Sequence, residues 1–208
     1  MLDTIFNRPG SAVDRWLSSL AARLHRVGVA PDVLSYAALA TGLLAAVLFY
    51  AGHEWPAFAM VFVSGILDAV DGRVARMGPG STPWGGVLDL TFDRIVEAAV
   101  LLGIAVPHPQ LHVPALVLAA TWYVNLCVFL AVGAASSKEP EKLIAYPPGL
   151  VERSEALVFA FIVVAGGPSI AAPVGYAYAA LEAATAAQRF RHGRAALRDS
   201  PPTAPAAP

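Results

Sequence analysis

The chain has 208 residues, of which 57% are hydrophobic and only 14% are charged, and its formal net charge is −1. Soluble domains are roughly 45–50% apolar and about 25% charged, so the composition excludes an ordinary soluble enzyme and a disordered chain. The near-zero charge also excludes a nucleic-acid binder, because no basic excess is available to neutralise phosphates. The single cysteine, Cys127, excludes an intramolecular disulfide, and its apolar surroundings favour a small core residue over a reactive thiol.

Residues 11–27 precede the first long apolar run and show the periodicity of an amphipathic helix. The apolar face of this helix is formed by Val13, Trp16, Leu17, Leu20, Leu24 and Val27. The opposite face is formed by Asp14, Arg15, Ser18, Ser19, Arg23 and Arg26. Trp and Leu opposite Arg indicate a helix that lies in the cytoplasmic membrane interface. The alternative is an ordinary helix packed on the rest of the protein.

Six further segments have the apolar character of membrane-spanning helices, which need about 20 mostly apolar residues. They cover residues 32–51, 55–76, 85–106, 112–134, 153–166 and 168–188. The second and third carry charged residues at one end, and the fifth is short. We therefore predict an all-α fold: a polytopic membrane protein with six transmembrane helices and an N-terminal amphipathic interfacial helix.

The connections between these segments differ in charge. AGHEW, PHPQLH and GGPS contain no lysine or arginine, whereas basic residues gather before residue 31, around 73–84, in the loop 135–153 and after residue 188. The positive-inside rule therefore predicts that both termini are cytoplasmic. The predicted regions are a cytoplasmic segment 1–31, a membrane domain 32–190 and a basic, then Pro/Ala-rich disordered tail 191–208. Compact length and composition favour the plasma membrane of a prokaryote.

Four aspartates stand at helical spacing inside the second and third segments. Asp68 and Asp71 are three residues apart, and Asp89 and Asp93 are four apart, so each pair lies on one face of its helix. Residues with almost no side chain share these faces: Gly72, Ala75, Gly85 and Gly86. The linker between the helices is rich in Gly and Pro, which suits a reversal of direction. We expect the four carboxylates to converge.

Four clustered carboxylates need compensating positive charge, because mutual repulsion would otherwise protonate some of them. Arg73 projects away from the aspartate face, and one arginine cannot balance four carboxylates. Oxygen ligands select Mg²⁺ or Mn²⁺ over zinc. The pattern therefore predicts two divalent ions, an arrangement that clamps the oxygens of a phosphoryl displacement.

Together these residues read Asp68-x2-Asp71-Gly72-x2-Ala75-Arg76-x8-Gly85-x3-Asp89-x3-Asp93. This string resembles the signature of the CDP-alcohol phosphotransferase (CDP-alcohol phosphatidyltransferase) family at all eight fixed positions. Upstream, Pro31-Asp32-x2-Ser35 resembles the family's Pro-Asn-x2-Thr/Ser, with Asp in place of the usual Asn.

The resemblance implies roles for the matching residues. Asp68, Asp71 and Asp89 would hold the two Mg²⁺ or Mn²⁺ ions, and Asp93 would complete the metal site and act as the catalytic general base. The residues implied in binding the CDP-linked donor are Pro31, Asp32, Ser35, Gly72, Ala75, Arg76 and Gly85. A carboxylate near the acceptor hydroxyl is also what the chemistry requires, because an alcohol is a poor nucleophile at neutral pH.

The implied reaction moves the phosphatidyl group of CDP-diacylglycerol to a small polar alcohol and releases CMP, in phospholipid biosynthesis. Gly149-Leu150-x2-Arg153-x-Glu155 resembles a segment of relatives with inositol-type acceptors, so Arg153 is a candidate acceptor or phosphate ligand. Inositol, inositol phosphate and glycerol 3-phosphate all remain open as acceptors. The alternatives are a soluble CDP-alcohol donor or, in a different class, a divalent-cation transporter. The expected partners are membrane lipids and, by the resemblance, a second copy in a homodimer, with no nucleic acid.

Overall fold

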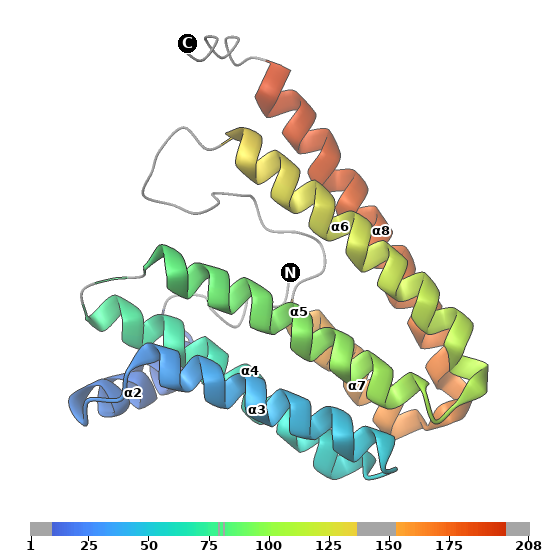
Figure 1. The fold of residues 1–208 in the computed structure, drawn as a ribbon, viewed down its shortest axis with the longest axis horizontal. Helices are drawn as coiled ribbons and strands as arrows, with labels where there is room; N and C mark the ends of the chain where they lie inside the picture. The colour runs from blue at the N-terminus through green and yellow to red at the C-terminus, as the bar shows by residue number, and fades with distance from the viewer. Residues whose placement is uncertain (1–9, 79, 81, 137–152, 199–208) are drawn as a thin grey trace.

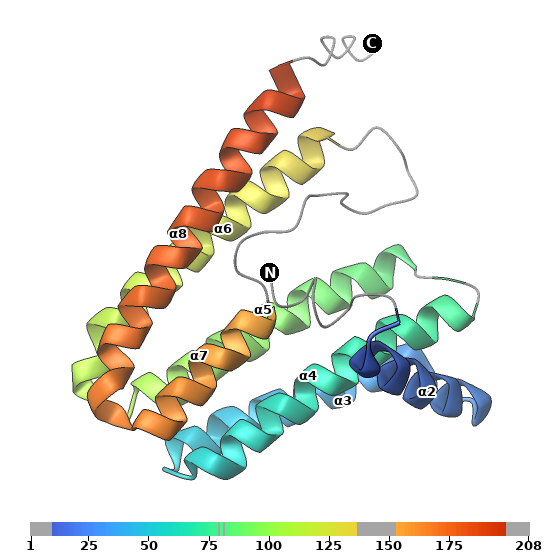
Figure 2. The same cartoon turned by 180° about the vertical axis from the view of Figure 1, so that it is seen from behind.

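The computed structural model describes residues 10–78, 80, 82–136 and 153–198, and the secondary structure of these residues is entirely helical. In chain order the elements are α2 (Ala12–Arg26), α3 (Pro31–Tyr50), α4 (Glu54–Met77), α5 (Pro83–Ala105), the short 3-10 helix η1 (Pro109–Leu111), α6 (His112–Ser136), α7 (Arg153–Gly166) and α8 (Pro168–Arg198). Figures 1 and 2 show α6 and α8 packed side by side, running in the same direction and diverging from the group formed by α3, α4, α5 and α7. The all-α prediction is confirmed for the described chain.

Local sequence signals explain several helix ends. Ser11 caps α2 by accepting a hydrogen bond from the backbone N–H of Asp14 at 3.0 Å, and Thr82 caps α5 by accepting one from Gly85 at 3.0 Å. Proline stands in the first turn of both α3 and α5, where its missing N–H costs nothing. The turn after α3 has Gly52 at φ 78°, a conformation that favours glycine.

Small residues let α3 and α5 approach closely. A Cβ added at Gly103 would lie 2.3 Å from the backbone oxygen of Ala46, and one added at Gly42 would lie 2.5 Å from Val96. Ser64 of α4, which is buried, ties that helix to α3 by donating to the carbonyl of Ala38 at 2.8 Å. These contacts fix α4 and α5 against a common neighbour, which in turn fixes the aspartates that the two helices carry.

A buried polar bridge joins the parallel helices α6 and α8. Asn125 donates to Glu182 at 2.5 Å, and Arg189 donates to the side-chain oxygen of Asn125 at 2.8 Å. Glu182, which the sequence left without an assigned partner, is 5% exposed and paired. Below this bridge, the ring of Tyr178 stacks on Phe159 of α7 with centroids 4.4 Å apart.

The observed helices coincide with the six predicted segments, and α8 continues to Arg198, past residue 188. Within the part of the chain that the structure describes, two stretches are long and apolar enough to cross a membrane by length and composition, Pro31–Tyr50 and Pro109–Ala135. The six-span count is therefore not confirmed: α4 and α5 are long enough, but their charged residues set them apart from such helices. The prediction that Cys127 is a core residue is wrong, since it lies on an exposed face of α6.

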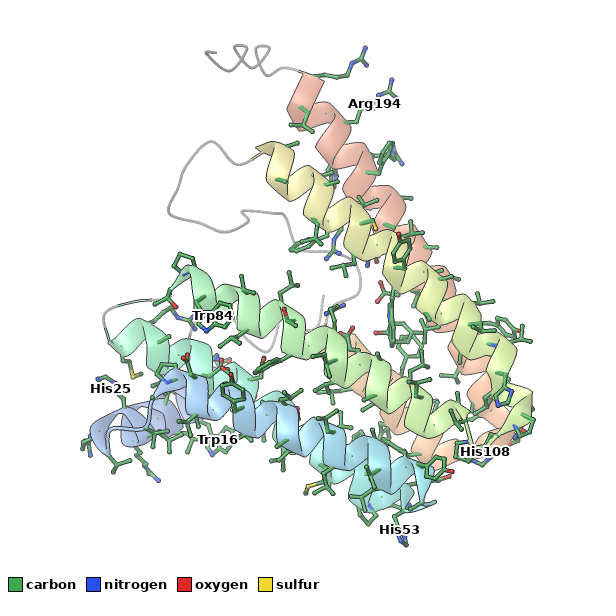
Figure 3. The ribbon with its side chains drawn as sticks, in the orientation of Figure 1. Trp16, His25, His53, Trp84, His108 and Arg194 are labelled. Carbon is green, nitrogen blue, oxygen red and sulfur yellow. The ribbon has the colours of Figure 1, made fainter. Side chains whose placement is uncertain are left out.

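The two sets of connections lie at opposite ends of the helix group. The α3–α4, α5–α6 and α7–α8 connections gather at the right-hand end in Figure 1, and the α4–α5 connection lies at the left. The labelled side chains of Figure 3 mark both ends, with His53 and His108 at one, and Trp16, His25 and Trp84 at the other. The basic residues around 73–84 are thus separated in space from the connections that lack them.

Candidate active site

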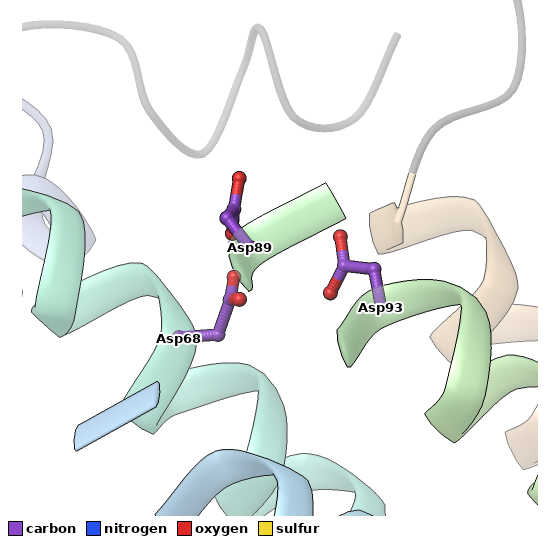
Figure 4. A group of neighbouring side chains, drawn as sticks. All are labelled: Asp68, Asp89 and Asp93. Carbon is purple, nitrogen blue, oxygen red and sulfur yellow. The ribbon is translucent and has the colours of Figure 1, made fainter. Parts of the chain in front are cut away.

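Three carboxylates from two helices converge at the left-hand end of the α4–α5 pair. Asp68 of α4 and Asp89 and Asp93 of α5 each offer an oxygen, and these oxygens all lie within 4.8 Å of one another. Figure 4 shows the three side chains turned toward a common point between the helices. The spacing on each helix, combined with the reversal between them, produces this convergence. An oxygen-only donor set at this separation fits a hard divalent cation such as Mg²⁺ or Mn²⁺.

Asp71, the fourth predicted aspartate, is buried on α4 beside this group. Its side chain is 7% exposed, and one carboxylate oxygen accepts a hydrogen bond from the hydroxyl of Ser35 at 2.5 Å. Ser35 lies in the first turns of α3, so the predicted upstream motif reaches the aspartates through this contact. The structure therefore brings Asp68, Asp89 and Asp93 into one cluster and holds Asp71 toward α3.

The glycines of the motif have visible steric roles. A Cβ at Gly72 would lie 3.5 Å from a guanidinium nitrogen of Arg76, which is an ordinary contact distance, so the guanidinium of Arg76 lies directly over Gly72. A Cβ at Gly85 would come within 3.3 Å of the hydroxyl of Thr82, which caps α5. Gly85 therefore serves the start of its helix as well as the cavity beside it.

An open cavity of about 1720 Å³ lies over the carboxylates. Of the residues predicted from the sequence, those that line it are Pro31, Asp32, Ser35, Asp68, Asp71, Gly72, Ala75, Arg76, Gly85, Asp89 and Asp93. Arg153 begins α7, but its side chain lies outside the described residues, as do Lys138 and Lys142. The cavity is large enough for a nucleotide-sized ligand and opens to the outside.

The sequence did not point to α2 as part of this cavity, yet α2 lines it with a run of residues from its first two turns. These residues are Ala12, Val13, Asp14, Trp16, Leu17 and Ser18. The amphipathic pattern of residues 11–27 was the one sequence signal for this arrangement, because it allowed the apolar face of the helix to pack on the rest of the protein. The structure shows that Leu17 and Ala21 are buried against α4, whereas Trp16 is 53% exposed.

Two arginines near the cluster pair with carboxylates outside it. Arg73 turns toward α2 and pairs with Asp14 at 3.3 Å, which agrees with its predicted projection away from the aspartate face. Arg94 forms a two-pronged ion pair with Glu97 on the same helix, at 2.7 and 2.8 Å.

Clustered carboxylates on a helix pair, beside small residues and an open cavity, are typical of metal sites that act on phosphate groups. The chain belongs to the CDP-alcohol phosphatidyltransferase family, whose model matches residues 28–186. The family and the enzyme class expected from the aspartate motif are thereby confirmed. Members of this family are integral membrane enzymes.

Three curated relatives of this chain are named as phosphatidylinositol phosphate or archaetidylinositol phosphate synthases. A phosphatidylinositol phosphate synthase of Mycobacteroides abscessus is 37% identical over 41% of this chain and 39% of its own length. An archaetidylinositol phosphate synthase of Pyrococcus horikoshii is 35% identical over 43% of this chain and 47% of its own. A phosphatidylinositol phosphate synthase of Mycolicibacterium smegmatis is 31% identical over 66% of this chain and 62% of its own. The matched parts therefore span less than two thirds of these three relatives.

The fold is also similar to solved structures of the phosphatidylinositol phosphate synthase of Mycobacterium tuberculosis. The structure with CDP-DAG bound is 26% identical, covers 86% of this chain and 94% of that one, and gives a TM-score of 0.69. The structure in complex with manganese and citrate is 25% identical, covers 86% of this chain and 88% of that one, and gives a TM-score of 0.70. The expected divalent cation and CDP-diacylglycerol thus both occur in a protein of the same fold.

Proposed function

We propose that this protein is a CDP-diacylglycerol-dependent phosphatidyltransferase that moves the phosphatidyl group to the hydroxyl of an inositol phosphate and releases CMP. The observation that carries the proposal is the convergence of Asp68, Asp89 and Asp93 within 4.8 Å beside the open cavity. The relative solved with CDP-DAG and with manganese supports both the donor and the metal.

The proposed metal ligands are Asp68, Asp71, Asp89 and Asp93. Asp68, Asp89 and Asp93 already present oxygens to one point, and Asp71 lines the same cavity. When bound, two Mg²⁺ or Mn²⁺ ions would lower the charge on the donor's pyrophosphate and on the departing CMP. Asp71, oriented by Ser35, would take part in the same site through its second oxygen.

In the proposed reaction the acceptor hydroxyl attacks the phosphorus that carries the diacylglycerol. Asp93 accepts the hydroxyl proton as the new O–P bond forms, and the bond from that phosphorus to the oxygen of CMP breaks, with CMP taking the electron pair. Arg76, whose guanidinium lies over Gly72, can stabilise phosphate charge. No covalent intermediate with the protein is required.

The proposed location is the prokaryotic plasma membrane, with both termini and the aspartate cluster on the cytoplasmic side. The two apolar stretches of α3 and α6 support membrane insertion, and the separation of the basic connections supports the orientation. The acyl chains of the donor would stay in the bilayer while its pyrophosphate reaches the carboxylates. Fusion of a reporter to residue 208 would test the orientation. A reporter that is active only in the cytoplasm should give a signal if this end of the chain is cytoplasmic.

Inositol phosphate is the proposed acceptor because the matched curated relatives of M. abscessus, P. horikoshii and M. smegmatis are named as inositol phosphate lipid synthases. The test is CMP release by purified protein with CDP-diacylglycerol and Mn²⁺ or Mg²⁺. Inositol phosphate, inositol, glycerol 3-phosphate and serine would be supplied one at a time. We expect turnover with inositol phosphate to exceed that with every other acceptor. Preferred turnover with glycerol 3-phosphate would overturn the acceptor but keep the reaction class.

Two further arms of the assay address the other hypotheses. Replacing CDP-diacylglycerol by soluble CDP-alcohols tests a soluble donor, and we expect no CMP release from them. Loading the protein into vesicles with a Mn²⁺-sensitive dye tests cation transport, and we expect no flux without lipid donor. We also propose a homodimer, which cross-linking in native membranes followed by mass determination would test.

A further inference from the structure

An ion pair connects α2 to α4 immediately beside the aspartates. A terminal guanidinium nitrogen of Arg73 lies 3.3 Å from a carboxylate oxygen of Asp14, and the side chains are 13% and 27% exposed. The other terminal nitrogen of Arg73 donates to the backbone carbonyl of Ala69 at 2.8 Å, one turn back on α4. The guanidinium is therefore anchored to its own helix while it holds a carboxylate of another.

Asp14 is itself held in place before Arg73 reaches it. Its backbone N–H donates to the hydroxyl of Ser11 at 3.0 Å, and its carboxylate accepts the backbone N–H of Gly10 at 3.1 Å. This reciprocal arrangement resembles a capping box at the start of α2. Because the cap already orders the carboxylate, little further side-chain entropy is lost when the ion pair forms.

The apolar contact between α2 and α4 is small and lies farther along α2. Leu17 and Ala21 are buried against Val70 and Val74, which are almost completely buried on α4. The Asp14–Arg73 pair is one turn nearer to the start of α2 than Leu17. It therefore restrains the first turn of α2, which the apolar contact does not reach.

That first turn is also part of the cavity. Val13, Asp14 and Trp16 line it from α2, across from Asp68 of α4 and Asp89 of α5. Asp71, the residue two positions before Arg73, lines it as well. Movement of the start of α2 would change the shape of the cavity without moving the carboxylate cluster.

We propose that Asp14 and Arg73 form a positioning pair, which holds α2 as a wall of the donor-binding cavity and thereby sets the affinity for the CDP-linked lipid. This inference rests on the proposed function. Both residues act through the placement of α2 rather than on the reacting atoms. Breaking the pair is expected to raise KM for CDP-diacylglycerol while kcat changes little, because the aspartates stay in place.

The kinetic experiment is a double-mutant cycle with Asp14→Asn, Arg73→Gln and the double variant in full-length protein. We expect each single change to raise KM for CDP-diacylglycerol about three- to five-fold, the size expected for a partly exposed ion pair. The double variant should be no worse than either single one, because the second change removes a partner that is already lost. Arg73→Lys, which keeps the charge, should recover most of the affinity.

The matched controls neutralise one acidic and one basic side chain that lie away from the Asp14–Arg73 pair. Glu54→Gln neutralises an acid at the opposite end of α4, and Arg23→Gln neutralises an exposed arginine of α2. Both should leave KM within about two-fold of the parent protein. If Arg73 binds a donor phosphate directly instead, Arg73→Gln would raise KM and Asp14→Asn would not, which overturns the positioning role.

Hydrogen exchange provides a readout that does not depend on activity. Backbone amides in the first turns of α2 should exchange faster in Asp14→Asn and in Arg73→Gln, whereas amides of α5 should be unchanged. Unaltered exchange in α2 would overturn the proposal. If the parent protein releases no CMP, the proposed function fails, while the exchange experiment still decides whether the pair holds α2.

Discussion

The hydroxyl of Ser35 donates a hydrogen bond of 2.5 Å to a carboxylate oxygen of Asp71. The contact joins residues 36 positions apart and links the start of α3 to the C-terminal half of α4. Ser35 also approaches the carbonyl of Pro31 at the longer distance of 3.3 Å, so the carboxylate is its better acceptor. The upstream motif and the aspartate motif, which the sequence presents as separate strings, thus form one site.

Loss of this hydrogen bond is expected to weaken the proposed metal site. In Ser35→Ala, Asp71 loses the donor that orients it, and such outer-shell partners typically contribute about 10- to 100-fold in metal affinity. The measurement is the Mn²⁺ concentration that gives half-maximal CMP release. Ser35→Thr keeps the hydroxyl and should behave like the parent. An unchanged Mn²⁺ midpoint in Ser35→Ala would show that Asp71 needs no such support.

Neutralising Asp93 is expected to abolish turnover without unfolding the protein. Asp93→Asn removes the carboxylate that would accept the hydroxyl proton, and general-base catalysis typically contributes about 10²- to 10⁴-fold. The measurements are CMP release and the thermal unfolding midpoint in detergent. Thr91→Ala, a change at an exposed position of the same helix, is the control. Substantial activity in Asp93→Asn would assign the base to another residue.

The close crossing of α3 and α5 predicts a large steric effect from one methyl group. In Gly103→Ala the new Cβ would lie 2.3 Å from the oxygen of Ala46, which is backbone and cannot rotate away. Overpacking of this kind typically costs about 1–3 kcal/mol. The matched control is Gly65→Ala, whose Cβ would meet only Leu157 at 3.9 Å. Equal thermal midpoints for the two variants would contradict the observed crossing.

The polar bridge between α6 and α8 predicts a stability loss that leaves the aspartate site intact. Asn125→Leu removes both the donor to Glu182 and the acceptor for Arg189, and a hydrogen bond to a charged group typically contributes about 1.5–3 kcal/mol. Denaturant or thermal unfolding would measure the loss. Tyr123→Phe, at an exposed position two residues earlier, should be neutral. A fully stable Asn125→Leu protein would mean that the bridge is dispensable.

The Asp14–Arg73 pair also predicts a pH dependence. The pKa of Asp14 is lowered below its ordinary value of 3.8, chiefly by the N–H of Gly10 and further by Arg73 and Arg15, against an opposing effect of desolvation. A lowered pKa in the folded state stabilises the protein above the unfolded value and loses this contribution as pH falls through the folded value. The difference in α2 exchange between parent and Asp14→Asn, after correction for intrinsic exchange rates, should therefore persist at pH 5. It should shrink only below about pH 3.8, and a loss of the difference already at pH 5 would contradict the ionised pair.

Much of the fold could be predicted because helix formation in this chain is a local property. Continuous apolar runs, capping residues such as Ser11 and Thr82, and glycine and proline at the junctions define the helices within a few residues. The aspartate spacing likewise determined which carboxylates share a helix face, and the observed cluster of Asp68, Asp89 and Asp93 follows from it. Family membership followed from the same motif, which lies within the matched residues 28–186.

Contacts between helices distant in sequence depended on the tertiary structure. Asp14 is the single acid of α2 and stands three residues after the capping Ser11, but its pairing with Arg73 requires α2 to pack on α4. The same holds for Asn125, Glu182 and Arg189, whose hydrogen bonds form only when α8 packs against α6. The sequence by itself determined the helices, the motif and the chemical type of the site. Only the tertiary structure decided that Ser35 holds Asp71 and that α2 forms a wall of the cavity, because both depend on side chains that meet only after the helices pack.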